Sequence, residues 1–128
     1  MGKSFKVILD TNFLLTMVRY KIHAINEIKS QIPTEFFILS GISDELQGLS
    51  KNKKIKKEVS IITKILETNK VQGIKSQQKQ VDDELVSLSK EYIIATNDKE
   101  LRKRIREFGG KTIYIKKLTT VDLENVRD

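Results

Sequence analysis

Residues 7–15 read Val7-Ile8-Leu9-Asp10-Thr11-Asn12-Phe13-Leu14-Leu15, in which an apolar run stops at an acidic residue. The run extends back to Phe5, interrupted by Lys6, and its mostly continuous hydrophobicity is typical of a strand buried on both faces. From Asn12 to about Ser30 the apolar residues follow a helical period instead. The stretch therefore predicts a buried strand, Phe5 to Leu9, that passes through Asp10 into a helix.

The same alternation of strands and helices continues along the chain. Further strands are predicted at 35–39, 71–75, 92–95 and 112–115, and further helices from an N-cap at Ser40, after Lys51, at 82–90 and at 99–108. Pro33 interrupts the first helix, and Gly109-Gly110 is typical of a helix C-cap. Alternating units of this kind predict an α/β fold with a mostly parallel sheet covered by helices on both faces. We place the domain at residues 1–118 and treat 119–128 as a C-terminal tail.

Length and composition limit the class of protein. The chain has 128 residues, 38% of them hydrophobic and 32% charged, which suits one globular domain. It has no apolar run that could span a bilayer and no secretory start. Cysteine is absent, which excludes a disulfide framework and a zinc ribbon. We therefore expect a cytoplasmic protein.

Basic residues outnumber acidic ones by 24 to 17, giving a formal net charge of +7. Such an excess attracts polyanions, with nucleic acid the first candidate, although abundant lysine also occurs in proteins from high growth temperatures. The lysine run at 51–57 is more typical of a solvated helix face. Arg102, Lys103 and Arg106 share one face of the helix at 99–108. They are candidates for contacting RNA phosphates, with plain solvation as the alternative.

Two acidic residues follow predicted strands. Asp10 comes directly after the first strand, and Asp98 follows the strand at 92–95 in Ala95-Thr96-Asn97-Asp98. In parallel α/β sheets the ligand binds beyond the carboxyl ends of the strands, so both carboxylates are expected at the same edge. Taken singly, each is more often a helix cap. The pair together favours a binding site.

Two predicted helices bring further acids to this edge. Glu45 lies early in the helix after the second strand, and Asp82 and Asp83 open the helix that precedes the strand at 92–95. If the apolar residues that follow form the buried face, Asp82 falls about 60° from its centre and Asp83 about 160° away. Asp82 is therefore predicted to point inward, where a carboxylate is costly unless it is paired or binds a cation.

Converging carboxylates repel one another, and a hard divalent cation relieves that repulsion. Mg²⁺ or Mn²⁺ with oxygen ligands suits such a site. A zinc site of His and Cys ligands is excluded, because the chain has no cysteine and only one histidine, His23. A bound divalent cation can generate a hydroxide-like nucleophile and neutralise a phosphodiester. Acidic residues of this kind in a basic protein are typical of a metal-dependent nuclease.

Four stretches of the chain resemble the PIN-domain family and occur in the family's order. They are residues 7–15, Ser40 through Leu46, Asp82-Asp83-Glu84-Leu85-Val86, and Ile94-Ala95-Thr96-Asn97-Asp98. Together they cover nearly the whole chain. Within the family, the Asp-Asp-Glu-Leu stretch and the run from Tyr92 to Arg106 look most like the branch that processes small-subunit ribosomal RNA precursors.

The resemblance implies a three-layer α/β/α sandwich and a Mg²⁺- or Mn²⁺-dependent endoribonuclease site. Apart from the resemblance, we expect RNA as a partner and a homodimer as one assembly. Four positions match the family's metal-binding and catalytic acids: Asp10, Glu45, Asp82 and Asp98. Thr96 and Asn12 match polar positions that line the same site. Asp83 would replace Asp82 as the third acid if the match shifted by one residue.

Three classes of function are compatible with parts of this pattern. A catalytic endoribonuclease, in ribosomal RNA maturation or as the toxin of a toxin–antitoxin pair, uses the whole acid set. A non-catalytic RNA-binding or assembly module would keep the fold without needing the acids. A response-regulator-like receiver also places acids at strand ends, but the order of residues does not suit its phospho-accepting aspartate and late lysine. The sequence favours the endoribonuclease and leaves the maturation and toxin roles open.

Overall fold

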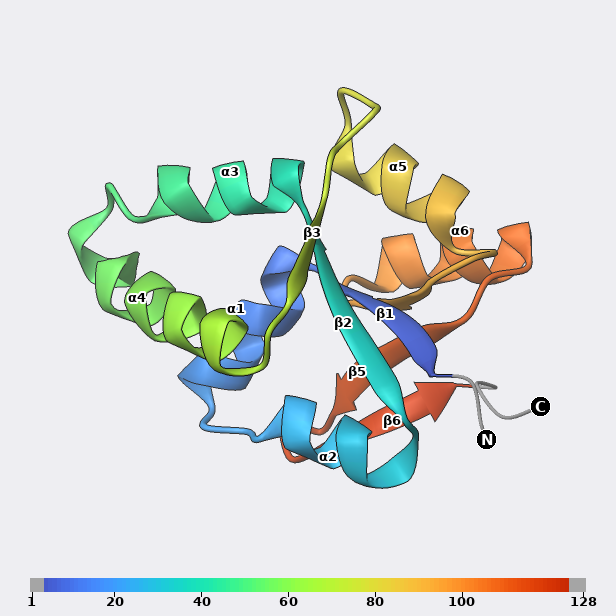
Figure 1. The fold of residues 1–128 in the computed structure, drawn as a ribbon, viewed down its shortest axis with the longest axis horizontal. Helices are drawn as coiled ribbons and strands as arrows, with labels where there is room; N and C mark the ends of the chain where they lie inside the picture. The colour runs from blue at the N-terminus through green and yellow to red at the C-terminus, as the bar shows by residue number, and fades with distance from the viewer. Residues whose placement is uncertain (1–3, 125–128) are drawn as a thin grey trace.

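The structure, a computed structural model, describes residues 4–124. The strands are β1 (Phe5–Leu9), β2 (Thr34–Leu39), β3 (Gln72–Ile74), β4 (Ile93–Ala95), β5 (Thr112–Lys116) and β6 (Thr120–Glu124). The helices are α1 (Thr11–Arg19), α2 (Ala24–Gln31), α3 (Ser40–Leu49), α4 (Lys53–Thr68), α5 (Val81–Leu88) and α6 (Lys99–Phe108). The strands form one sheet between two layers of helices (Figure 1), which confirms the predicted three-layer α/β/α sandwich. Within 4–124 no helix is both long and apolar enough to cross a membrane; the cytoplasmic location stays a prediction.

The order of the strands determines where a ligand can bind. The order is β3-β2-β1-β4-β5-β6, and every neighbouring pair is parallel except β5 and β6. The chain winds from β1 out to β3 and then returns to β4 on the other side of β1. Because such crossovers are right-handed, α1 to α4 cover one face and α5 and α6 the other (Figure 1). The winding reverses between β1 and β4, and in α/β sheets the crevice at such a point holds the ligand.

The predicted first strand, β1, lies at the centre of the sheet. Val7, Ile8 and Leu9 have no exposed surface, since β1 is paired on both edges and covered on both faces. This double burial explains the continuous apolar run. Leu9 is in register with Ala95 of β4, so the residues that follow these two positions lie side by side.

The single helix predicted from Asn12 to Ser30 was wrong, because the structure divides it into α1 and α2. Lys21 adopts a left-handed backbone with a φ of 54° between the two helices. Ile22, next to it, is buried. A left-handed conformation normally falls on Gly or Asn, and residues 20–23 contain neither. The sequence therefore contains no recognisable signal for the break between α1 and α2.

The segment 119–128 was predicted to be a C-terminal tail, and for its described part this was wrong. Residues 120–124 form β6, which pairs antiparallel with β5 at the edge of the sheet. Val121 is buried, and its N–H donates a hydrogen bond of 3.1 Å to the Glu27 carboxylate of α2. The preceding turn places Lys117 and Leu118 at positive φ, without the Gly or Asn that usually marks a hairpin.

The N-cap predicted at Ser40 was also wrong. Helix α3 begins at Ser40 itself, and Leu39 occupies the cap position without a side-chain hydrogen bond. The N–H of Gly41 instead donates to the hydroxyl of Ser76, 35 positions away, at 2.9 Å. A cap supplied from so far along the chain cannot be found from local sequence.

Candidate active site

Asp10 lies where β1 passes into α1, at the reversal of the winding. Its side chain caps α1, with Oδ1 accepting a hydrogen bond of 2.9 Å from the Thr11 N–H. Oδ2 accepts a hydrogen bond of 2.8 Å from the Thr96 hydroxyl, and the residue is only 5% exposed. Burial raises the pKa of Asp10, and the hydrogen bonds from Thr96 and Thr11 offset only part of that rise. The charges of Asp82 and Asp98 raise this pKa further.

Thr96 and Asn12 connect the ends of β1 and β4. Thr96 is fully buried, and its hydroxyl lies 3.2 Å from Asn12 Oδ1. The same Asn12 oxygen accepts a hydrogen bond of 2.8 Å from the N–H of Asn97. The Asn97 side-chain amide in turn pairs with the backbone N–H and carbonyl of Ile115 in β5. The structure thus places both predicted polar positions beside Asp10 and fixes the loop that carries Asp98.

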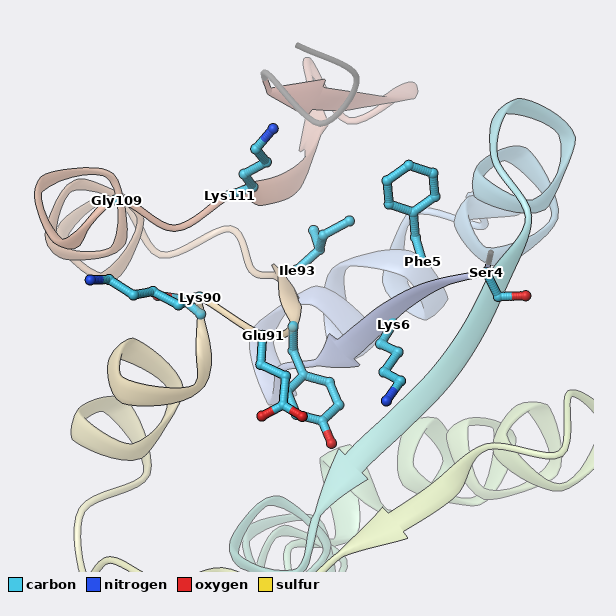
Figure 2. Close-up of a pocket in the computed structure, with 10 residues that line it drawn as sticks. Ser4, Phe5, Lys6, Lys90, Glu91, Ile93, Gly109 and Lys111 are labelled. Carbon is cyan, nitrogen blue, oxygen red and sulfur yellow. The ribbon is translucent and has the colours of Figure 1, made fainter. Parts of the chain in front are cut away.

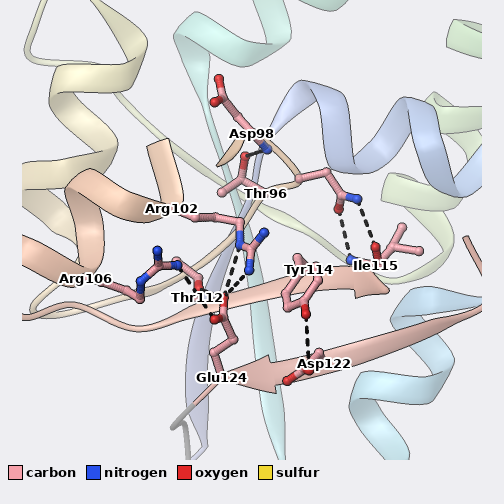
Figure 3. Close-up of polar contacts among 10 residues, drawn as sticks. Thr96, Asp98, Arg102, Arg106, Thr112, Tyr114, Ile115, Asp122 and Glu124 are labelled. Atoms are coloured by element: carbon pink, nitrogen blue, oxygen red, sulfur yellow. Dashed lines mark hydrogen bonds and ion pairs between the residues drawn. The ribbon is translucent and has the colours of Figure 1, made fainter. Parts of the chain in front are cut away.

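Asp98 caps helix α6 with one of its two carboxylate oxygens. Oδ1 accepts hydrogen bonds of 2.9 and 3.1 Å from the N–H groups of Glu100 and Leu101. The N–H of Asp98 donates to the Thr96 hydroxyl at 3.2 Å, as Figure 3 shows. Within the described part of the chain, Oδ2 accepts no hydrogen bond. Asp98 is therefore a helix cap that keeps one oxygen for another ligand.

Glu45 and Asp82 reach the same region from helices α3 and α5. Both residues are exposed to solvent. Partial burial raises the pKa of Glu45, and the charges of Asp10 and Asp82 raise it further. Partial burial and the charge of Asp98 likewise raise the pKa of Asp82, although Arg104 opposes that rise. The four predicted acids therefore interact repulsively across a common space.

The inward orientation predicted for Asp82 was wrong as regards burial. Both Asp82 and Asp83 are exposed, and the buried acid of α5 is Glu84, at 2% exposure. The buried face of α5 contains Glu84 and Leu85, because Glu84 satisfies backbone N–H groups of the preceding loop and so tolerates burial. Asp83 forms an exposed ion pair of 2.8 Å with Arg104. The charge of Asp82, unlike that of Asp83, raises the pKa values of Asp10 and Glu45.

The donor set of these acids fits a hard divalent cation. Asp10, Glu45, Asp82 and Asp98 offer only carboxylate oxygens, the ligands that Mg²⁺ and Mn²⁺ prefer. Among residues 4–124 no three His, Cys, Asp or Glu side chains converge as they would around a metal ion. Repulsion between like charges opposes such convergence. A cation between the acids would relieve the repulsion that, after burial, contributes to the raised pKa values of Asp10, Glu45 and Asp82.

A cleft of about 810 Å³ opens beside Glu45 and Asp82. It is lined by the start of α3, the loop before α5, the first turn of α5, and α6: Gly41, Asp44, Glu45, Lys79, Gln80, Val81, Asp82, Asp83 and Arg104. Sequence reasoning missed two cations in this lining, Lys79 and Arg104. Arg104 reaches the cleft through its ion pair with Asp83 on a different helix, which no local spacing reveals.

The three basic residues predicted to contact RNA have different surroundings. The Arg102 side chain is only 12% exposed and donates hydrogen bonds of 3.1 and 2.8 Å to Glu124 in β6. Its guanidinium also lies 3.6 Å from the centroid of the Tyr114 ring (Figure 3). Arg106 approaches the same Glu124 at 3.7 Å, whereas Lys103 is exposed. Arg102 thus joins α6 to the sheet, and its contact with RNA phosphates stays a prediction.

A second cleft, of about 320 Å³, lies at the opposite edge of the sheet, by the amino ends of β1, β4 and β5 (Figure 2). Its lining includes Lys6, Lys90 and Lys111, whose side chains point in different directions in Figure 2. Lys6 and Lys90 lie over the rings of Tyr92 and Phe108, 5.8 and 4.8 Å from their centroids. Among the described residues that line this cleft only Glu91 is acidic, so the candidate site is at the carboxyl edge.

Two curated proteins are similar to most of this chain. Ribonuclease VapC4 of Methanocaldococcus jannaschii is 30% identical over 110 residues, which cover 80% of this chain and 84% of that protein. Ribonuclease VapC9 of Archaeoglobus fulgidus is 27% identical over 130 residues, which cover 96% of this chain and 94% of that protein.

Solved structures and a family model extend the comparison. The structure of the PIN domain endonuclease Utp24 matches with a TM-score of 0.75 and 26% identity, over 99% of this chain and 98% of that one. A domain of a functionally unknown protein from Methanocaldococcus jannaschii matches in fold, with a TM-score of 0.61 and 14% identity, over 88% of this chain and 92% of that one. A family model described as the PIN like domain matches residues 7–117. The chain therefore belongs to the family of PIN like domains.

Proposed function

We propose that this chain is a metal-dependent endoribonuclease whose catalytic acids are Asp10, Glu45, Asp82 and Asp98. One observation carries the proposal: Asp10 and Asp98, at the carboxyl ends of neighbouring strands β1 and β4, both contact the buried Thr96. Two further acids complete the set from the helices on either side. The negative charges of these four acids repel one another, and a hard divalent cation bound among them would relieve that repulsion.

The chain's own residues supply positioning and electrostatic attraction. Asp10 is held by two hydrogen bonds, and Asp98 is held by its cap with one oxygen left over. Mg²⁺ or Mn²⁺, when bound, would lower the pKa of a water molecule and neutralise the charge of a phosphodiester. Lys79 and Arg104 in the adjoining cleft attract the phosphates that flank the cleaved bond. Asn12, next to Thr96, completes the polar lining.

RNA is the substrate that the comparisons support. The two curated relatives are named as ribonucleases, and the similar solved structure is titled as an endonuclease. We favour a role in ribosomal RNA maturation, from the resemblance of the Asp-Asp-Glu-Leu stretch and residues 92–106 to that branch of the family. The likeness to two ribonucleases that share the VapC name is the observation that keeps a toxin ribonuclease as the second candidate. A homodimer stays a prediction.

The test is RNA cleavage by the wild type and by variants of single acids, with and without EDTA. Asp98→Asn is the most informative variant, because it can keep the helix cap while it removes the charge. To separate the two cellular roles, the neighbouring gene would be examined. A small adjacent gene whose product suppresses the activity would favour the toxin.

A further inference from the structure

The relative position of Glu45 and Asp82, the two acids carried by helices, depends on contacts outside the sheet. Asp10 and Asp98 are held by the register of β1 with β4. Glu45 and Asp82, in contrast, lie on α3 and α5, which belong to opposite layers of the sandwich. The loop at 75–80 connects β3 to α5 and passes the start of α3, so its contacts determine how far apart these two acids lie.

Ser40 and Ser76 join this loop to α3 by a reciprocal pair of hydrogen bonds. The N–H of Ser76 donates to the Ser40 hydroxyl, and the N–H of Gly41 donates to the Ser76 hydroxyl, both at 2.9 Å. A helix N-terminus otherwise leaves such N–H groups without a partner. The loop therefore completes the first turn of the helix that carries Glu45.

Close packing at Gly41 also keeps the loop and the start of α5 against the start of α3. A Cβ added to Gly41 would lie 3.0 Å from Val81 Cγ2 and 3.1 Å from Ser76 Oγ. Val81 is the first residue of α5. The absence of a side chain at Gly41 thus lets the starts of α3 and α5 approach each other.

Glu84 fixes the other end of the loop. Its carboxylate is buried at 2% exposure and accepts a hydrogen bond of 2.7 Å from the Gln77 N–H, with the Gln78 N–H at 3.5 Å. Within residues 4–124 no basic side chain forms an ion pair with it. A buried carboxylate without a cation is costly, and its position in the first turn of α5 offsets part of that cost. Glu84 thus ties the loop to the helix that carries Asp82.

We propose that Ser40, Ser76 and Glu84 form a clasp that positions Glu45 and Asp82 for metal binding. The inference rests on the proposed function and deepens it. Glu84 is a positioning residue and not a metal ligand, because its oxygens are occupied by backbone N–H groups of the loop. Releasing the clasp leaves all four acids in the chain but lets the two helices shift relative to each other.

The test compares Mn²⁺ affinity, by calorimetry on the full chain, in variants that release the clasp. Ser76→Ala removes the acceptor of the Gly41 N–H, Gly41→Ala pushes Ser76 and Val81 away from the start of α3, and Glu84→Ala releases the loop. The control is Ser89→Ala, a buried serine at the far end of α5 whose hydroxyl donates to a carbonyl 2.6 Å away. All are measured well below their unfolding temperatures, and amide exchange of Gly41 and Gln77 is followed alongside.

We expect the clasp variants to bind Mn²⁺ about 10- to 100-fold more weakly than the wild type, as for other residues that orient metal ligands. Ser89→Ala should keep the wild-type affinity even if it loses stability. If Glu84→Ala does not fold, Ser76→Ala and Gly41→Ala decide the question. Wild-type affinity in the folded clasp variants overturns the clasp alone. Equal Mn²⁺ affinity in the wild type and Asp10→Asn overturns the proposed site, and the clasp with it.

Discussion

The hydroxyl of Thr96 donates a hydrogen bond of 2.8 Å to Oδ2 of Asp10, joining two residues 86 positions apart in the sequence. The same hydroxyl accepts a hydrogen bond of 3.2 Å from the N–H of Asp98. One buried side chain therefore connects the acids that follow β1 and β4. In consequence, Asp10 and Asp98 are held in place by the central strands of the sheet.

Replacing Thr96 by valine keeps its shape and removes both hydrogen bonds. Asp10 Oδ2 and the Asp98 N–H then lose their hydrogen bonds to the buried Thr96 hydroxyl. We therefore expect Thr96→Val to destabilise the protein by about 1–3 kcal/mol. Urea unfolding measures this loss, and calorimetry should show weaker Mn²⁺ binding. The control is Thr112→Val, which removes the hydrogen bond of another buried threonine, to Glu124. If both variants lower Mn²⁺ affinity equally, Thr96 has no particular role at the site.

Glu124 gives a dependence of stability on pH. Burial acts to raise the pKa of Glu124, but hydrogen bonds from Arg102 and Thr112 outweigh it, and this pKa is lowered from its ordinary 4.5. The unfolded chain therefore binds a proton at higher pH than the folded one. Glu124 thus contributes stability above pH 4.5, which is lost as the pH falls through its folded pKa.

The wild type is compared with Glu124→Gln in urea unfolding across that pH range. The difference in free energy of unfolding between the two proteins isolates the effect of Glu124. The stability of the wild type alone would not, because Asp10, Glu45 and Asp82 have raised pKa values, which favour the folded state as the pH falls. We expect the wild type's advantage over Glu124→Gln to shrink on acidification. A constant difference would show that folding does not lower the pKa of Glu124.

RNA affinity should depend on the cations of the cleft. Lys79→Ala and Arg104→Ala should each weaken binding of single-stranded RNA and reduce the slope of log affinity against log salt by about one. Filter binding at several salt concentrations measures both effects. Lys57→Ala, an exposed position on α4, is the matched control. A loss at Lys57 as large as at Arg104 would argue against the cleft as the path of the RNA.

Asp82 and Asp83 should behave differently although they are adjacent. Asp82 interacts with the other acids, whereas Asp83 forms an exposed ion pair with Arg104, of a kind that contributes little to stability. Mn²⁺ should raise the unfolding temperature of the wild type and Asp83→Asn, since a ligand of the folded state stabilises it. The rise should be lost in Asp82→Asn. The reverse pattern would make Asp83 the third acid.

The central features were predictable because they depend on local sequence. The buried run at Phe5 to Leu9 and the acids after two strands are set by hydrophobicity and by position along the chain. Parallel pairing then brings Asp10 and Asp98 to one edge. The features that were missed depend on contacts distant in sequence: Ser76 caps α3, Glu124 neutralises Arg102, and β6 forms after a turn without glycine.

The side chains of α5 show most clearly where prediction from the sequence alone fails. The helical wheel was centred on the apolar residues that follow, so it turned Asp82 inward and did not consider Glu84. Glu84 is buried because N–H groups of a neighbouring loop satisfy it. Only the path of that loop reveals this, and the path is a property of the whole fold.

The proposed function is tested most directly by RNA cleavage in the presence of Mn²⁺, comparing the wild type with Asp98→Asn. In the structure Asp98 caps α6 through Oδ1 alone, and asparagine is an equally good cap, so the variant should stay folded by circular dichroism. We predict endonucleolytic cleavage by the wild type that EDTA abolishes, and no cleavage by Asp98→Asn. Cleavage that continues in EDTA, or at the wild-type rate in Asp98→Asn, would contradict the metal-dependent mechanism.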